Sequence, residues 1–285
     1  MIQDYQCDRV YISALLQNEC PGTYQNLVEV LDKHDVRWSR LEGTHDIWCR
    51  DYMPLQVLPD CFEGYLYDPD YLRNRKYRAT ITDGNELCRN MGIRVGSSLE
   101  GIRIDGGNVV KADGRIIMTS KVFEENPQIP VSELSRLLEM ALGERLIVLP
   151  WDTAEIFGHA DGICRYVGDD TVLMTNYSQI DPKMASRFKH CLKPYFKSVK
   201  ELKFKTKKPC KYNWAYINWL QTDKVLIMPK FNVPEDEQAF EQVSELMPQY
   251  AGSIEMVEAT DLVVHDGALN CCSWTISEGL SKVMH

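Results

Sequence analysis

The strongest constraint on the fold is a spacing. Five segments with the apolar pattern of an amphipathic helix recur along the chain at intervals of roughly 50 to 60 residues. They begin near Pro21, near Thr80, after Pro130, after Asp181 and after Pro234, mostly at residues that suit a helix start. The chain has 285 residues, and 285 divided by five is 57, which falls within this interval. The spacing therefore predicts a fivefold internal repeat.

Runs rich in branched and aromatic residues lie between these helices and predict strands, for example at 9–14, 145–150, 171–175 and 224–229. Each unit is predicted to run strand, strand, helix, strand. Five such units would expose apolar faces if they stacked openly, so we expect them to close into a ring of blades around a central axis. One doubly wound sheet is the alternative. No low-complexity linker divides the chain, so residues 1–285 are predicted to form a single domain.

The charge balance limits the possible partners. Asp and Glu number 41 against 32 Lys and Arg, giving a net charge of -9, and no basic stripe is present to bind a phosphate backbone. We therefore expect no nucleic-acid partner. The chain has no run of about 18 apolar residues, so no membrane span is predicted. A diffuse acidic charge mildly favours small cationic ligands.

The cysteine pattern predicts a reduced, cytoplasmic protein. The ten cysteines include no C-x-x-C pair, and most of them lie inside apolar runs, where free thiols behave as small hydrophobic residues. The first residues carry an acidic side chain at Asp4 and no apolar signal-peptide region.

Two motifs in the first half of the chain contain candidate functional carboxylates. Asp46-Ile-Trp-Cys-Arg-Asp51-Tyr-Met-Pro54 places two carboxylates and an arginine in an aromatic stretch that ends at a proline. Asp105-Gly-Gly-Asn108 is a turn whose glycines allow the backbone to approach a ligand while Asp105 faces a site. A surface Arg–Asp pair and an ordinary tight turn are the simpler interpretations.

Two further motifs lie in the second half. His159 and Asp161, in Gly158-His-Ala-Asp161, point the same way if the segment is extended, so they can deliver an acid/base group and a cation-binding carboxylate to one pocket. Cys271 follows a glycine-containing run, which suits a thiol nucleophile with a distant partner. A histidine bonded to a nearby carbonyl and a pair of core cysteines are the simpler interpretations.

The four motifs are more specific in combination than any one of them. Their order is that of the guanidino-group-modifying superfamily, and within it the sequence most resembles the agmatine deiminase and bacterial-type peptidyl-arginine deiminase family, over about residues 44 to 275. Residues 45–54 resemble the family motif N-D-x-W-x-R-D-x-G-P, residues 105–108 resemble E-G-G-x, residues 158–161 resemble G-H-x-D, and residues 266–271 resemble the nucleophile motif G-G-G-N-x-H-C.

The resemblance implies an α/β propeller of the pentein type, with five pseudo-symmetric ββαβ-type units around a central active site. It also implies three catalytic residues: Cys271 as nucleophile, His159 as general acid/base, and Asp105 as the carboxylate that orients the imidazole. Cys272 is expected to face away from the pocket if Cys271 faces into it in a strand.

The substrate implied by the resemblance is a small cationic guanidino compound: agmatine, a related alkylguanidine, free arginine or peptidyl-arginine. Asp51 and Asp161 would hold the guanidinium, and the further expected substrate-binding residues are Asp46, Trp48, Arg50 and Asn108. The scheme requires no metal or other cofactor, and a homo-oligomer is compatible with it.

The chemistry explains why these groups occur together. Carboxylates accept paired N–H bonds from a flat guanidinium and leave one face open to a thiolate. The expected products are a ureido compound and ammonia, formed through a covalent thiouronium. The gathered carboxylates are expected to raise the pKa of Cys271, so that the bound cation favours the thiolate.

Three other functions are compatible with the sequence. An amidinotransferase of the same superfamily would pass the amidino group to an amine instead of water. A metal site could be formed by His159, Asp161 and His265. A non-catalytic protein that retains the fold could bind a small molecule.

Overall fold

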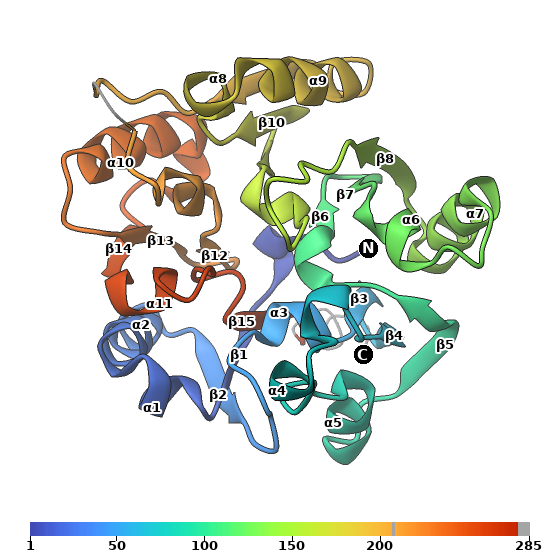
Figure 1. The fold of residues 1–285 in the computed structure, drawn as a ribbon. Coiled ribbons are helices and arrows are strands. Elements are labelled where there is room, and N and C mark those ends of the chain that lie inside the picture. Colours follow the sequence, from blue (N-terminus) through green and yellow to red (C-terminus); the bar gives the residue numbers. More distant parts are fainter. Residues whose placement is uncertain (207–208, 279–285) are drawn as a thin grey trace, which may run out of the picture.

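The computed structural model describes residues 1–206 and 209–278. Within these ranges it has an α/β architecture with five separate three-stranded sheets, so the alternative of one doubly wound sheet is wrong. Figure 1 shows the five sheets placed around a common centre, with the longer helices toward the outside.

All five sheets have the same topology: the first strand pairs antiparallel with the second, and the second pairs parallel with the third. Sheet by sheet, the strands are β15 (Ser273–Ile276), β1 (Arg9–Ser13) and β2 (Arg37–Leu41); β3 (Leu55–Leu58), β4 (Cys61–Leu66) and β5 (Val95–Arg103); β6 (Val110–Lys111), β7 (Arg115–Thr119) and β8 (Arg145–Leu149); β9 (Cys164–Gly168), β10 (Thr171–Met174) and β11 (Ser198–Glu201); β12 (Leu220–Gln221), β13 (Leu226–Lys230) and β14 (Ile254–Glu258).

A longer helix connects the second and third strands of every sheet, which confirms the predicted order of strand, strand, helix and strand. These helices are α2 (Pro21–Lys33), α5 (Gly84–Asn90), α7 (Val131–Leu142), α9 (Pro182–Leu192) and α10 (Glu235–Leu246). The shorter helices are α1 (Leu16–Glu19), α3 (Cys49–Tyr52), α4 (Arg75–Arg78), α6 (Lys121–Glu125), α8 (Tyr177–Ile180) and α11 (Thr260–Val263). The 3-10 helices are η1 (Asp4–Gln6), η2 (Asp70–Leu72), η3 (Gly106–Asn108), η4 (Ala160–Gly162), η5 (Asn213–Ile217) and η6 (Pro248–Tyr250).

Local chemistry explains where these helices begin and end. In α9, Pro182 occupies the first turn and the Asp181 carboxylate accepts two backbone N–H groups of that turn. Helix α7 ends at Gly143, whose φ of 67° is a left-handed conformation that glycine adopts without strain. Phe188 and Leu192, one turn apart in α9, are fully buried against the sheet.

The first sheet joins the two ends of the described chain. Strand β15 pairs antiparallel with β1, with Tyr11 opposite Trp274. The β15 strand is therefore the first strand of the unit that β1 and β2 complete, and the repeat is offset from the start of the chain. This pairing links residues more than 250 positions apart, so the first sheet contains strands from both ends of the described chain (Figure 1).

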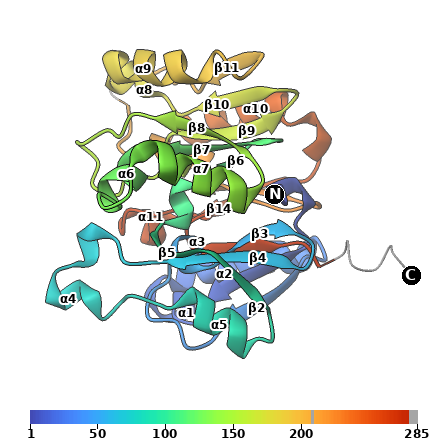
Figure 2. The ribbon, with the colours of Figure 1, turned by 90° about the vertical axis from the view of Figure 1, so that its right-hand side faces the viewer.

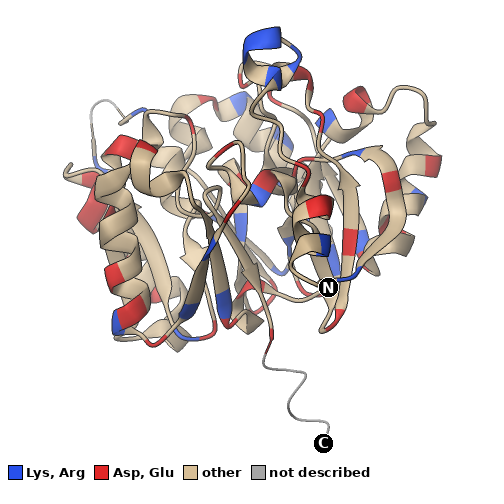
Figure 3. Cartoon of the chain, turned by 90° about the horizontal axis from the view of Figure 1, so that it is seen from below, with Lys and Arg blue, Asp and Glu red and all other residues tan. Residues whose placement is uncertain are grey.

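Charged residues of both signs are interspersed over the elements (Figure 3). The segment that carries α4 projects from one end of the molecule (Figure 2). Among the helices of the described ranges, none has both the length and the apolar character needed to cross a membrane.

Trp274 connects two neighbouring sheets and provides a test of their packing. Its ring lies 5.2 Å from the ring of Tyr11 and 5.8 Å from the ring of Phe62 in β4, and its indole N–H donates to the carbonyl of Pro54 at 2.9 Å. We expect Trp274→Ala to lower the free energy of unfolding by about 3–5 kcal/mol, measured by denaturant titration, because it removes a large buried side chain. The exposed Met140→Ala is the control, and comparable losses in both variants would contradict this role.

Candidate active site

A short turn precedes the first strand of every sheet. These turns are α3 before β3, η3 before β6, η4 before β9, η5 before β12 and residues 269–272 before β15. Helix α3 packs against η3, η3 against η4, and η4 against η5. The five turns thus meet at the centre of the molecule, where four of them contain or adjoin the predicted site residues.

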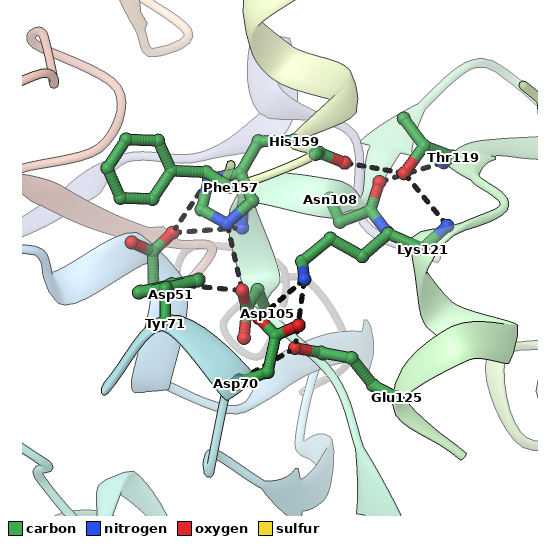
Figure 4. A network of polar contacts seen from close by, with 12 residues as sticks. Asp51, Asp70, Tyr71, Asp105, Asn108, Thr119, Lys121, Glu125, Phe157 and His159 are labelled. Atoms are coloured by element: carbon green, nitrogen blue, oxygen red, sulfur yellow. Dashed lines mark hydrogen bonds and ion pairs between the residues drawn. The ribbon is translucent and has the colours of Figure 1, made fainter. Parts of the chain in front are cut away.

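Side chains link the turns of the second, third and fourth sheets. The Asp51 carboxylate accepts the backbone N–H of Gly107 at 3.2 Å. His159 Nε2 lies 2.9 Å from Asp105 Oδ2, and His159 Nδ1 lies 3.8 Å from Asp51 Oδ1. Two carboxylates from different turns therefore flank one imidazole, as Figure 4 shows.

Further hydrogen bonds link the turns of the fourth, fifth, first and second sheets. Asn218 Nδ2 donates to the carbonyl of Asp161 at 3.4 Å, and the backbone N–H of Asn270 donates to the carbonyl of Asn218 at 3.0 Å. The backbone N–H of Arg50 donates to the carbonyl of Cys271 at 3.0 Å. Each turn is hydrogen-bonded to the next, so the relative positions of the functional groups are fixed by backbone as well as by side chains.

Two adjoining cavities of about 320 Å³ and 360 Å³ open on this centre. Both are lined by Phe157, His159, Asp266 and Cys271. Asp161 lines the first cavity, which extends between aromatic and acidic side chains: Trp151, Asp152, Glu155, Tyr177 and Trp214. Asp51 lines the second cavity, which extends toward Asp46, Trp48, Tyr67, Tyr71 and Tyr77.

The imidazole of His159 is held in its charged form. Burial alone would lower its pKa, but the charges of Asp51 and Asp105 and the hydrogen bond to Asp105 outweigh burial and raise the pKa to about 10. The ring is therefore a proton donor at neutral pH.

The charged form of the Asp51 carboxyl group is disfavoured: burial and the neighbouring charges of Asp105 and Asp161 raise its pKa, and the adjacent His159 opposes this shift. This carboxyl group lacks a full counter-charge in the ligand-free protein. A bound cation would supply that charge and favour the ionised form.

Cys271 lies beside the second carboxylate. Its sulfur is 3.8 Å from Asp161 Oδ2 and 3.2 Å from Asn218 Oδ1, to which the thiol donates. Burial and the charges of Asp161 and Asp51 raise the pKa of the thiol well above its ordinary value. This confirms the direction expected from the sequence, and it means that the free protein holds a thiol.

Together these groups can bind and attack a flat cation. Asp51 and Asp161 flank a cavity wall that also presents a proton donor and a thiol, and a cation between the carboxylates would lower the pKa of that thiol. The structure thus brings together Asp51, Asp105, His159, Asp161 and Cys271, as the sequence predicts.

Two of the predicted substrate-binding residues do not reach the cavities, and these predictions are wrong for a direct contact. The Arg50 guanidinium is buried and donates to the carbonyl of Asn270 at 3.4 Å and to the Thr275 hydroxyl at 3.3 Å. Asn108 is buried too, and its side-chain oxygen accepts the backbone N–H of Thr119 at 2.8 Å. Both side chains form hydrogen bonds to neighbouring segments of the protein and do not line either cavity.

The other predicted residues of this group, Asp46 and Trp48, do line the second cavity. Cys272 faces the core with its sulfur 3.5 Å from the carbonyl of Leu269, as expected, although the two cysteines lie in a turn and not in a strand. His265 also lines the second cavity, and the described residues contain no group of three His, Cys, Asp or Glu side chains arranged to hold a metal ion.

The glycines of Asp105-Gly-Gly-Asn108 allow a close approach of the site's own groups. A Cβ on Gly107 would lie 2.6 Å from His159 Nδ1 and 2.7 Å from Asp51 Oδ1, and a Cβ on Gly106 would lie 1.9 Å from the carbonyl oxygen of Arg50. No larger residue fits at either position without moving the turns apart.

Sequence reasoning missed Asn218 and Asp266. Asn218 accepts both the backbone N–H and the thiol of Cys271, at 3.3 Å and 3.2 Å. The available signal was a single amide within the apolar run of residues 215–220, since a lone buried amide requires a partner. Asp266 has a positive φ of 65° and lines both cavities.

Comparisons with known proteins agree with this arrangement. The model of the Porphyromonas-type peptidyl-arginine deiminase family matches residues 8–276. The agmatine deiminase of Pseudomonas putida KT2440 is 23% identical to the chain over 305 residues, which cover 88% of this chain and 79% of that protein.

Solved structures share the fold. The agmatine deiminase of C. jejuni has a TM-score of 0.76 at 16% identity and covers 98% of this chain and 96% of its own. DDAH from Pseudomonas aeruginosa has a TM-score of 0.60 at 13% identity and covers 95% of this chain and 100% of its own.

The charge coupling between His159 and Asp51 can be tested without a substrate. Asp51→Asn removes the first of the charges that raise the imidazole pKa, so we expect the pKa of His159 to fall by about 1–3 units, followed by NMR titration of the ring. Asp46→Asn, which removes a cavity carboxylate that does not contact the ring, is the matched control and should shift the pKa far less. Equal shifts in the two variants would contradict the assignment.

Proposed function

This chain belongs to the Porphyromonas-type peptidyl-arginine deiminase family, and we propose that it is a cysteine-dependent hydrolase that converts a guanidino group to a ureido group and ammonia. The observation that carries the proposal is the convergence of Cys271, His159, Asp51 and Asp161 on adjoining cavities. The similar agmatine deiminases are consistent with it.

In the first half of the reaction, the guanidinium lies between Asp51 and Asp161, each of which accepts N–H bonds from it. Binding of this cation favours loss of the thiol proton to solvent, because His159 is already protonated, and the resulting thiolate of Cys271 attacks the central carbon. His159 then donates a proton to one nitrogen, which leaves as ammonia. The product is a thiouronium bound to the enzyme through sulfur.

In the second half, His159 is neutral and accepts a proton from a water molecule that attacks the same carbon. The new C–O bond forms and the C–S bond breaks, and the departing thiolate takes up the proton of the new hydroxyl group, which leaves the ureido carbonyl. The net reaction converts a guanidinium and water into a ureido compound and an ammonium ion. Asp105 takes part by orienting the imidazole through its 2.9 Å contact.

The cavity lining favours an alkylguanidine such as agmatine. The residues that line the two cavities include the acidic groups Asp46, Asp152, Glu155 and Asp266 beyond the guanidinium-binding pair, and no lysine or arginine of the described chain is among them. An ammonium at the far end of the substrate would therefore find a carboxylate partner.

A substrate with a carboxylate is the second candidate, and one observation favours it. Tyr77 of α4 lines the second cavity, and the other residues of this helix, Arg75, Lys76 and Arg78, are basic and exposed. Arginine or a peptide that ends in arginine could place its carboxylate near this helix.

We also propose that residues 1–285 are a single catalytic domain and that its described part forms one closed α/β propeller of the pentein type. The common strand order of the five sheets and the hydrogen bonds that link their turns support this arrangement.

The ten cysteines are all free in the structure, which supports the proposal that the protein acts in the reducing cytoplasm.

The nucleophile assignment gives the most direct test. We expect Cys271→Ala to reduce ammonia release to background, because its sulfur lines both cavities. Cys272→Ala should retain turnover, since that sulfur faces the core. Circular dichroism of both variants checks that they fold. Equal loss in the two folded variants would contradict the assignment of Cys271.

A substrate panel tests the reaction and separates the two candidates. With no acceptor amine present, we expect ammonia from agmatine, and its absence from every guanidino compound would favour amidino transfer or simple binding. Free arginine and peptides ending in arginine complete the panel.

If arginine or the peptides are better substrates, Arg75→Gln should raise their KM and leave the KM of agmatine unchanged. No effect of Arg75→Gln would exclude helix α4 from recognition of the substrate carboxylate.

A further inference from the structure

An ion cluster around a buried lysine lies next to the catalytic pair and has no part in the mechanism given above (Figure 4). The Lys121 side chain in α6 is only 2% exposed, and its Nζ lies 2.6 Å from Asp70 Oδ1 and 3.3 Å from Glu125 Oε1. The ammonium also lies 4.7 Å from the ring centroid of Trp151, a wall of the first cavity. Removing a lysine from water is costly unless its charge is paired, so this cluster holds a defined geometry.

The cluster anchors the start of a projecting segment. Asp70 belongs to η2, in the connection between β4 and α5, and residues 73–79 of this connection are exposed. Besides its ion pair with Lys121, Asp70 donates its backbone N–H to Glu125 Oε1 at 3.0 Å. Both contacts tie η2 to the buried side of α6, while the part of the connection that carries α4 extends outward (Figure 2).

The next residue in η2 reaches the catalytic pair. The Tyr71 hydroxyl donates to Asp105 Oδ2 at 3.0 Å, the same oxygen that lies 2.9 Å from His159 Nε2. Asp105 Oδ1 is buried and has no hydrogen-bond partner in the described part of the chain. Tyr71 and His159 are therefore the side chains that hold this carboxylate.

Neighbouring groups define the position of Tyr71, and one of them is Tyr67, with which it shares a side-chain hydrogen bond. Its ring packs edge-on against Phe157, with centroids 4.9 Å apart. The nearby Tyr65 hydroxyl donates to the backbone carbonyls of Asp51 and Met53, so it is already engaged elsewhere. Loss of the Tyr71 hydroxyl would leave the Asp105 carboxylate with the imidazole as its remaining side-chain contact.

We propose that Tyr71 is a positioning residue for the Asp105–His159 pair and that the ion cluster of Lys121, Asp70 and Glu125 holds Tyr71 in place. The catalytic consequence rests on the proposed function. With the hydroxyl bound, the carboxylate is turned toward the imidazole, which keeps His159 aligned to protonate the leaving nitrogen. Alignment of this kind affects the chemical step, so it changes kcat more than KM.

The first experiment compares Tyr71→Phe with Tyr166→Phe. Tyr166 is a matched control because it is also partly buried and donates to an aspartate, Asp113, away from the catalytic centre. We expect Tyr71→Phe to lower kcat about tenfold or more with KM within about twofold, and the control to keep both constants. An unchanged kcat would overturn the proposal, and a raised KM with an unchanged kcat would show that Tyr71 contacts the substrate instead.

The second experiment tests the ion cluster by a double-mutant cycle. If Lys121 acts through Tyr71, the variant with both Lys121→Met and Tyr71→Phe should have a kcat no lower than the worse single variant. Losses that multiply would overturn the role of the cluster. If Lys121→Met does not fold, Asp70→Asn replaces it in the same cycle, because the Asp70 side chain is 38% exposed and makes the closest contact to Lys121.

The ring resonances of His159 separate this proposal from the proposed function, because NMR observes them without turnover. Tyr71→Phe should shift the Nε2 resonance, since the oxygen that faces it loses its second partner, and Tyr166→Phe should not. If the wild type is inactive on the whole guanidino panel but Tyr71→Phe shifts the resonance relative to the wild type, the proposed function is overturned and the positioning role is retained. An active wild type without the shift would overturn the positioning role alone.

Discussion

The geometry of the site depends on the contact of five turns, each placed immediately before the first strand of a sheet. Residues Asp51, Asp105, Asp161, Asn218 and Cys271 lie in or beside these turns, and successive members are 54, 56, 57 and 53 residues apart. A residue at the corresponding place of each unit therefore reaches the same centre. The hydrogen bonds between successive turns then fix the side chains relative to one another, as preorganised catalysis requires.

Burial of several carboxylates beside a thiol produces a site that is incomplete without a cation. Asp51 and Cys271 both have raised pKa values, first because of burial and then because of the neighbouring carboxylates. His159 supplies the main positive charge within the site, and the carboxylates raise its pKa in return. In the proposed reaction, a bound guanidinium would add the missing charge and shift Asp51 and Cys271 toward their ionised forms, which would couple substrate binding to nucleophile activation.

The errors of the sequence analysis have a common physical cause. Arg50 and Asn108 were expected to bind substrate because they lie within motifs, but neighbours in a turn point in different directions. The Arg50 guanidinium therefore faces Asn270 and Thr275, and the Asn108 amide faces Thr119. Asn218 was missed for the converse reason: it has no neighbour in sequence with a related function, and its partner Cys271 is 53 residues away.

The sequence by itself determined the repeat, the five longer helices and the resemblance that groups the five central residues, because helix starts, apolar periods and motifs are local properties of the chain. Only the tertiary structure decided that β15 completes the first sheet and which side chain of each turn faces the cavities. It also decided that the Tyr71 hydroxyl contacts Asp105 and that Lys121 pairs with the neighbouring Asp70. These features depend on contacts between residues tens to hundreds of positions apart, and such contacts arise only when the units pack against one another.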